Sequence, residues 1–291
     1  MNFSKEKIAI FYAILSAALY ALSTPISKVM LQTVSPLMVA SFLYIGAGIG
    51  MGVMMLLREK RGRTTEERLH WSDLPYTVSM VALDILAPIL LMFGLTTCSA
   101  ANTALLNNFE IVATALFALF MFHERVSRKL CIAIAFVTVA SILLSIDGES
   151  LDDTFSFSFG SLLVLGATVC WGLENNCTRQ IADRDPMEIV TVKGFGSGLG
   201  AMVIALCAGA EFPTYSSLLI ILVLGYVAYG LSIYFYTYSQ RVIGAAKTST
   251  YYALAPFIGA FLSIVLLGEH ITLIFVVASV VMAIGCWLAA K

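Results

Sequence analysis

Long apolar stretches, separated by short polar ones, follow one another along the whole chain. Each stretch is roughly 17 to 24 residues long, enough for a helix to cross about 30 Å of hydrocarbon. The pattern predicts ten membrane-spanning helices, at residues 8–31, 36–57, 74–96, 100–122, 129–146, 159–180, 187–209, 216–238, 247–268 and 272–290. Composition agrees, because 59% of the 291 residues are hydrophobic and only 12% are charged. The predicted fold class is an all-α integral membrane protein.

The second half of the chain repeats features of the first half. Four residues recur 150 positions later: Pro36, Gly46, Gly48 and Gly50 as Pro186, Gly196, Gly198 and Gly200. Five recur 145 positions later: Ala100, Ala101, Thr103, Ala115 and Glu124 as Ala245, Ala246, Thr248, Ala260 and Glu269. An odd number of crossings in each half places the second half upside down relative to the first, as in many solute transporters. The sequence therefore predicts two inverted five-helix repeats, at 1–146 and 159–291, joined by an acidic extracytoplasmic linker at 147–158.

The distribution of Lys and Arg predicts the orientation of these helices. With the N-terminus in the cytoplasm, fifteen of the seventeen Lys and Arg residues fall on the cytoplasmic side or at its edge. Lys28 lies toward the other face, and Lys193 lies within a span. Positively charged short loops stay in the cytoplasm during insertion. We therefore expect a multi-pass protein of the cell (plasma) membrane with both termini cytoplasmic.

Both halves also carry related short motifs. In the second half these are Trp171-Gly172, the string Ala245-Ala246-Lys247-Thr248-Ser249 leading to Ala255-Pro256, and Leu267-Gly268-Glu269. The first half has Ser99-Ala100-Ala101-Asn102-Thr103 and Glu124, with Tyr20-Ala21 in place of the Trp-Gly pair. Over essentially the whole chain this arrangement resembles the EamA-type repeat of the drug/metabolite transporter (DMT) superfamily. The resemblance implies a ten-helix transporter of two EamA-like repeats. It implies no single substrate, because the family carries amino acids, amines and other metabolites.

Two acidic residues lie near the middle of predicted spans. Glu110 shares one helical face with Thr103, Asn107 and Thr114, so this polar stripe must face the protein interior. Asp84 lies near the midpoint of the preceding span. The Glu110 carboxyl group is either a neutral group hydrogen-bonded to a neighbouring helix or a contact for substrate or a transported proton. Asp84 and Glu110 lie at similar depth on sequential helices, so the alternatives for the pair are to share a proton or to hold a cation together. Glu110 and Asp84 are the candidates for proton coupling.

Further polar positions predict a substrate site between the first and sixth spans. Span six presents Trp171, Glu174, Asn175 and Thr178 on one face, and span one presents Tyr20, Ser23, Thr24 and Ser27 at equivalent positions. Lys193 lies at the depth of Glu174, which favours an ion pair over separate substrate contacts. Aromatic rings beside carboxylates suit an organic cation or the ammonium group of an amino acid. The predicted substrate-binding residues are Tyr20, Ser23, Thr24, Asp84, Asn107, Glu110, Trp171, Glu174, Asn175, Lys193, Tyr229 and Tyr252.

Small residues and prolines within the spans predict close packing and kinks. Gly46 with Gly50, and Gly196 with Gly200, have the four-residue spacing that lets helices approach closely in lipid, either for packing alone or for gating. Pro25 and Pro256 interrupt helical hydrogen bonding and either kink the helix or free a carbonyl for a ligand. Spans five and ten are the least polar, so we expect them at the periphery or in a homodimer contact.

These features together predict a secondary membrane transporter that works by alternating access. Its energy source is either coupling to protons, through Glu110 or Asp84, or the gradient of the substrate itself. Its expected substrate is a small polar or amphipathic metabolite, an amino acid or a related compound. The alternatives are an organic cation or drug exporter of the same fold, a channel, and a non-transporting membrane scaffold. No enzymatic role is expected, because the sequence contains no HExxH, GxSxG or P-loop motif. No cofactor, metal or nucleic acid is expected, and the partners are the small-molecule substrate and the lipid bilayer.

Overall fold

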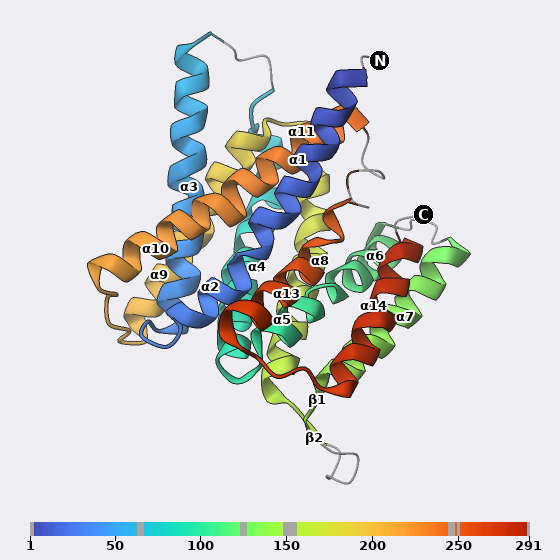
Figure 1. The fold of residues 1–291 in the computed structure, drawn as a ribbon. Coiled ribbons are helices and arrows are strands. Elements are labelled where there is room, and N and C mark those ends of the chain that lie inside the picture. Colours follow the sequence, from blue (N-terminus) through green and yellow to red (C-terminus); the bar gives the residue numbers. More distant parts are fainter. Residues whose placement is uncertain are drawn as a thin grey trace.

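The computed structural model describes residues 3–62, 67–122, 127–147, 156–243, 248 and 251–289. Its helices are α1 (Phe3–Ala21), α2 (Ser23–Met30), α3 (Pro36–Lys60), α4 (Leu74–Thr97), α5 (Ala100–Leu106), α6 (Phe109–Phe122), α7 (Arg128–Ser145), α8 (Phe159–Arg179), α9 (Pro186–Cys207), α10 (Tyr215–Gly225), α11 (Ser232–Ile243), α13 (Ala255–Leu267) and α14 (Leu273–Ala289). A 3₁₀ turn at Trp71–Asp73 precedes α4, and a π-helical segment at Tyr226–Leu231 joins α10 to α11. Figure 1 shows these helices as one bundle.

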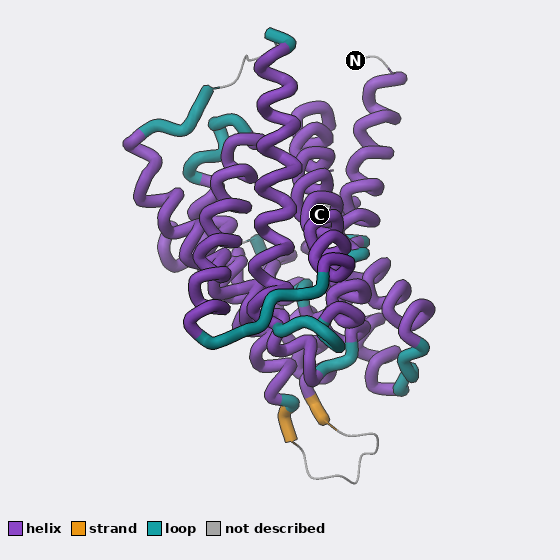
Figure 2. Tube along the Cα trace, turned by 90° about the vertical axis from the view of Figure 1, so that its left-hand side faces the viewer, coloured by secondary structure: helices purple, strands orange, loops and turns teal. Residues whose placement is uncertain are grey.

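A short β-ladder flanks the acidic linker that the sequence predicts between the halves. Strand β1 (Ile146–Asp147) pairs antiparallel with β2 (Ser156–Phe157), and residues 148–155 between them lie outside the described residues. Figures 1 and 2 place this ladder at one end of the helix bundle, and Figure 1 shows both ends of the chain toward the other end. His123, Glu124, Ala245, Ala246, Lys247 and Ser249 also lie outside the described part of the chain.

The helices have the length and surface of a membrane protein. Within the described residues, seven helical segments are long and apolar enough to cross a membrane, and α13 and α14 are shorter apolar helices. Large apolar side chains are exposed on several of them, among them Val53, Val78, Phe261, Val265 and Val280, each at least half exposed. Such a surface is stable in hydrocarbon and costly in water. The chain is a multi-pass membrane protein with an all-helical membrane region.

Matching caps begin the second span of each half. Ser35 accepts a hydrogen bond from the backbone N–H of Met38, and Asp185 accepts one from Met187. In each case a proline follows at the first helical position, where its missing N–H costs nothing. The repeated Pro36 and Pro186 therefore mark the start of α3 and α9.

Helices of the first half pack mainly on helices of the second half. Extensive interfaces between the two halves join α3 to α9, α4 to α8, α1 to α11, α5 to α13 and α7 to α14. Spans five and ten thus pair with each other within one chain, and Figure 1 shows α7 and α14 together at one side of the bundle. The buried core between the halves includes Met38, Leu43, Met92, Leu106 and Val164.

Glycines allow several of these contacts to be backbone to backbone. Gly194 of α9 lies against Gly48 of α3, where a Cβ on Gly194 would come within 2.4 Å of the Gly48 nitrogen. The four glycines predicted at gating or packing positions face other helices: Gly46 and Gly50 lie against Leu222 and Tyr226, and Gly196 and Gly200 lie against Val81 and Ile85. Each pair of glycines therefore packs against the third span of the opposite half.

A single methyl group at Gly225 should destabilise the fold. A Cβ there would lie 2.0 Å from the carbonyl oxygen of Leu43, so α10 and α3 would have to separate. We expect Gly225→Ala to lower the free energy of unfolding by about 1 to 3 kcal/mol, the usual cost of overpacking. Thermal unfolding of the detergent-purified protein measures this. Gly52→Ala is the matched control, because its Cβ would meet Thr191 at an ordinary 3.4 Å, and equal losses in both variants would contradict the prediction.

Candidate functional site

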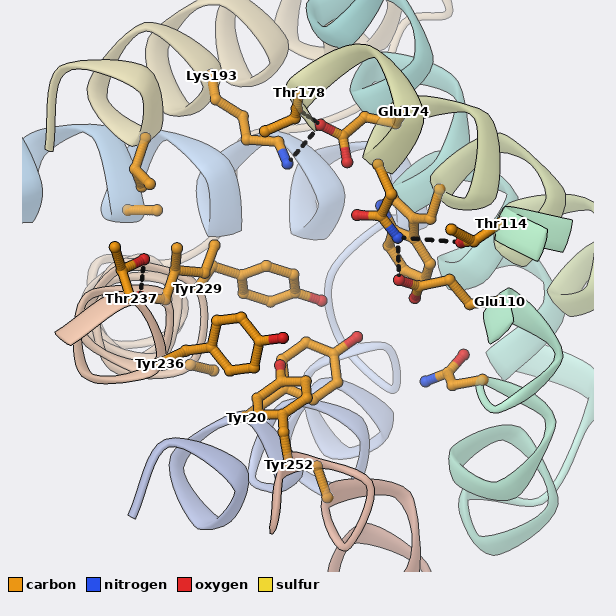
Figure 3. A pocket seen from close by; sticks show the side chains of 18 of the residues that line it. Tyr20, Glu110, Thr114, Glu174, Thr178, Lys193, Tyr229, Tyr236, Thr237 and Tyr252 are labelled. Atoms are coloured by element: carbon orange, nitrogen blue, oxygen red, sulfur yellow. Dashed lines mark hydrogen bonds and ion pairs between the residues drawn. The ribbon is translucent and has the colours of Figure 1, made fainter. Parts of the chain in front are cut away.

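A cavity of about 540 Å³ lies inside the helix bundle. Most of its lining is aromatic or aliphatic, with a few polar side chains from α6, α8 and α9. This mixture is typical of small-molecule sites, where apolar walls surround a few orienting polar groups. Figure 3 shows the cavity with a group of tyrosines on one side and Glu110, Glu174 and Lys193 on the other.

Four tyrosines form the aromatic side of the cavity. Tyr20 lies 5.7 Å from Tyr229 and 5.9 Å from Tyr252, measured between ring centroids, and Tyr236 lies 4.9 Å from Tyr252. Tyr229 belongs to the π-helical segment Tyr226–Leu231, which adds a residue to a turn and redirects its side chains. Such π-bulges are frequent at functional sites.

Glu110 lies at the beginning of α6, on the polar side of the cavity. Asn175 of α8 donates from Nδ2 to its Oε1 at 2.5 Å, and the same amide lies 3.4 Å from the Thr114 hydroxyl. The Glu110 carboxylate is therefore held by a neutral amide, and no ion pair to it is found among the described residues. Thr114, Asn175 and Glu110 all line the cavity.

The fourth span of each half is broken at the cavity, where the sequence pattern predicts continuous helices. In the first half α5 ends at Leu106 and α6 begins at Phe109, so Asn107 and Asn108 lie in the break. Asparagine side chains compete for backbone hydrogen bonds and weaken a helix interior. In the second half Ala253 and Leu254 form a turn before α13, which has Pro256 in its first turn. Proline supplies no N–H to a preceding turn, which explains this second break.

Lys193 forms a buried ion-pair cluster with two carboxylates. Its Nζ lies 3.0 Å from Oδ2 of Asp84 and 3.0 Å from Oε1 of Glu174, which also accepts a hydrogen bond from Thr178. Asp84 and Glu174 are almost fully buried, and the Lys193 side chain is 15% exposed. The ion pair predicted from the depth of Lys193 and Glu174 is therefore present, with Asp84 as a second partner.

Asp84 lies behind the cavity wall and is not among the residues that line it. Tyr44 donates its hydroxyl to Oδ1 of Asp84 at 3.0 Å, and Trp171 donates its indole N–H to the same oxygen at 3.2 Å. Both aromatic side chains line the cavity and separate Asp84 from it. Glu110 has different partners, so no contact joins the two carboxyl groups.

The two polar faces predicted for spans one and six differ in their exposure to the cavity. All four residues of the α8 face, Trp171, Glu174, Asn175 and Thr178, line it. From the first span only Tyr20 does, while Ser23 and Thr24 are buried outside it. The chain turns at Leu22 between α1 and α2, just before Pro25, and this changes the face that α2 presents. Thr103 is likewise buried outside the cavity, although Asn107, Glu110 and Thr114 of its predicted stripe line it.

Further residues line the cavity outside the predicted substrate-binding set, among them Tyr44, Asn108 and Tyr236. Tyr44 comes from α3, where an apolar, glycine-rich stretch gave no polar stripe to follow. Asn108 lines the cavity because the helix is broken at this position. A regular helical period does not predict which way a residue in such a break faces. Tyr236 belongs to a run of tyrosines in α11 whose inward members could not be separated by spacing alone.

The cavity extends toward the end of the molecule that carries Arg58, Arg184 and Arg241, called the basic end below. Ala182, Pro186 and Gln240 line it there. Loops of the two halves meet at this end: Arg58 pairs with Asp185, and Arg184 pairs with Asp73 at 2.8 Å and with Glu67 at 2.5 Å. The hydrogen bond to Asp73 raises the pKa of the Arg184 guanidinium above its ordinary value.

Charged side chains hold the helices together at the opposite end. Lys28 donates to the carbonyl oxygens of Leu95 at 2.6 Å and Cys98 at 2.7 Å, at the C-terminal end of α4. The Glu269 carboxylate accepts from the backbone N–H groups of Ala100 at 2.6 Å and Ala101 at 2.8 Å, at the start of α5. Both contacts satisfy backbone groups that a helix end leaves unpaired. They join the first, third, fourth and ninth spans.

The described residues contain no group of three His, Cys, Asp or Glu side chains placed to hold a metal ion. The polar groups of the described lining are carboxylates, amides, threonine hydroxyls, the Trp171 indole and the Lys193 ammonium group, beside the tyrosines. A helical membrane protein with such a cavity inside its bundle is typical of membrane transporters.

Comparison with known proteins identifies the family, and the chain belongs to the EamA-like transporter family. The family profile matches residues 7–146 and again residues 158–290. An uncharacterized transporter of Methanothermobacter thermautotrophicus is 23% identical, over 96% of this chain and 85% of that protein. The uncharacterized transporter YyaM of Bacillus subtilis is 25% identical, over 67% of this chain and 66% of that protein. The protein is thus a membrane transporter rather than an enzyme.

A solved crystal structure has the same fold. It superposes with a TM-score of 0.65 and 18% sequence identity, covering 99% of this chain and 96% of the other. At this identity the likeness concerns the fold alone.

Proposed function

We propose that the chain is a secondary transporter of a small polar or amphipathic metabolite, an amino acid or a related compound, and that it works by alternating access. The observation that carries this proposal is the cavity around Glu110, which reaches the basic end while the Lys28 and Glu269 contacts hold the opposite end together. A cavity open toward one side only is what one state of an alternating-access cycle requires.

Ten membrane-crossing helices in two inverted repeats, at 1–146 and 159–291, form the architecture of this proposal. Three observations support it. The family profile matches twice. The pairing of helices is unchanged when the halves are exchanged, because second, fourth and fifth spans pair with their counterparts and each first span pairs with the third span of the other half. Both fourth spans are broken, at Asn107 and Asn108 and, 146 positions later, at Ala253 and Leu254. Broken helices at the interface of repeats are a common way to build a transport site.

The proposed location is the plasma membrane, with the basic end and both termini in the cytoplasm. The basic residues Arg58, Arg184 and Arg241 gather at the end of the molecule toward which the cavity extends. Positive charge in short loops favours the cytoplasmic side. The described conformation is then the inward-facing one, and transport requires the Lys28 and Glu269 contacts to open while the basic end closes.

The proposal includes proton coupling through Glu110, and flux measurements in liposomes test it. The purified protein is reconstituted, a substrate gradient is imposed, and interior pH is followed with a trapped dye. We expect saturable substrate flux accompanied by proton flux, because Glu110 has no cationic partner within the part of the chain that the structure describes and can exchange a proton for substrate.

Liposomes without protein and liposomes with Glu110→Gln are the controls. Saturable solute movement without any pH change would remove proton coupling and leave the transporter. Non-saturable flux would indicate a channel, and no flux of any solute would indicate a scaffold.

A further inference from the structure

We infer that the cavity selects a substrate with a cationic amine on an aromatic or apolar body and without a free carboxylate. This inference rests on the proposed function and narrows its substrate class, a small polar or amphipathic metabolite, to amines that are related to amino acids but lack the carboxylate. It follows from the charges around the cavity, from two unpaired amide atoms and from the tyrosine rings.

The charges around the cavity favour a cation and oppose an anion. Among the described residues that line it, Lys193 is the one with a cationic side chain. Its ammonium group is shared by Asp84 and Glu174 at 3.0 Å each, so it is already outnumbered by carboxylates. Glu110 adds a further carboxylate with only a neutral partner. A substrate carboxylate would therefore be repelled, and in a low-dielectric site this repulsion is strong.

Two amide atoms in the helix break have no hydrogen-bond partner among the described residues. They are Oδ1 of Asn107, an acceptor, and Nδ2 of Asn108, a donor. Both side chains are more than nine-tenths buried and line the cavity. Buried polar atoms without partners are costly, so these two atoms are the expected contacts of a bound molecule. The acceptor suits an ammonium N–H, and the donor suits a neutral oxygen such as a hydroxyl or carboxamide carbonyl.

The tyrosine group suits the rest of such a molecule. Figure 3 shows Tyr20, Tyr229, Tyr236 and Tyr252 across the cavity from Glu110. Aromatic rings bind apolar groups and attract ammonium ions to their faces. An arylalkylamine can therefore place its ring among the tyrosines and its ammonium group at Glu110 and Asn107.

Binding of four related probes to the purified full-length protein tests the inference. The probes are 2-phenylethylamine, phenylalaninamide, phenylalanine and 3-phenylpropionate, compared by thermal shift and by calorimetric titration at one pH. We expect phenylethylamine and phenylalaninamide to bind, phenylalanine to bind at least about tenfold more weakly, because a carboxylate replaces a neutral amide, and phenylpropionate not to bind. Phenylalanine binding as tightly as phenylalaninamide, or binding of none of the four, would overturn the inference.

The variant Glu174→Gln tests the charge argument directly. It removes one of the two carboxylates that hold Lys193, so the ammonium group becomes available to a substrate carboxylate. We expect the preference for phenylalaninamide over phenylalanine to shrink severalfold, and an unchanged preference would contradict the inference. Counterflow in liposomes is measured separately. Transport of phenylalanine in place of the amines would contradict the inferred substrate class but not the transport function. Binding of the amines without any flux would contradict the transport function but not the inferred binding preference.

Discussion

Replacement of Glu110 by Gln is expected to abolish most transport while leaving the fold intact. Among the charged side chains that line the cavity, Glu110 is the one without an ion pair to any described residue, and its side-chain contact is with Asn175. Gln keeps the shape and can accept the same hydrogen bond, but it carries no charge and exchanges no proton. A hydrogen bond to a charged group contributes about 1.5 to 3 kcal/mol, so we expect substrate affinity and uptake to fall roughly 10- to 150-fold.

Uptake into liposomes and thermal unfolding in detergent separate the two effects of this substitution. Glu211→Gln is the matched control, because it removes the same charge from an exposed position between α9 and α10 that is not part of the cavity lining. We expect the control to transport normally and both variants to unfold near the wild-type temperature. Normal uptake by Glu110→Gln would show that this carboxyl group has a structural role only.

The helical period predicted which faces are polar but not which of them meet the cavity. The α8 face of Trp171, Glu174 and Asn175 lines it because α8 is a regular helix, so residues three and four apart stay on one side. The first span turns at Leu22, and Ser23 and Thr24 beyond that turn are buried elsewhere. The helical period therefore predicts which residues share a face only within one continuous helix.

Partners of buried charges were only partly predictable from the sequence. Depth along a span can match Lys193 with Glu174, because both positions can be counted from the same membrane edge. Depth does not show which spans are neighbours around the bundle. The sequence therefore predicts Asp84 as a substrate or proton site. In the structure Asp84 lies behind Tyr44 and Trp171 and forms an ion pair with Lys193. Lateral position comes from which helices pack together, and α4 with α8 and α3 with α9 are contacts between distant segments.

The second large effect is expected from replacing Lys193 by Met. This substitution keeps the length and apolar stem of the side chain but leaves Asp84 and Glu174 buried without a counter-charge. Removing one partner of a buried ion pair costs about 3 to 5 kcal/mol, because the remaining charge is poorly solvated. We therefore expect Lys193→Met to unfold at a markedly lower temperature, or to be recovered in low yield.

Neutralising the two acids together with the lysine should recover most of this loss. In the triple variant with Asp84→Asn and Glu174→Gln, the hydroxyl of Tyr44 and the indole N–H of Trp171 can still donate to the Asn oxygen, and Thr178 can still donate to the Gln oxygen. A neutral, hydrogen-bonded cluster of similar volume is often as stable as the buried ion pair that it replaces. Thermal unfolding of the wild type, single and triple variants in one detergent gives the comparison. A single variant as stable as the wild type, or a triple variant no more stable than the single one, would show that the charges of this cluster do not hold α4, α8 and α9 together.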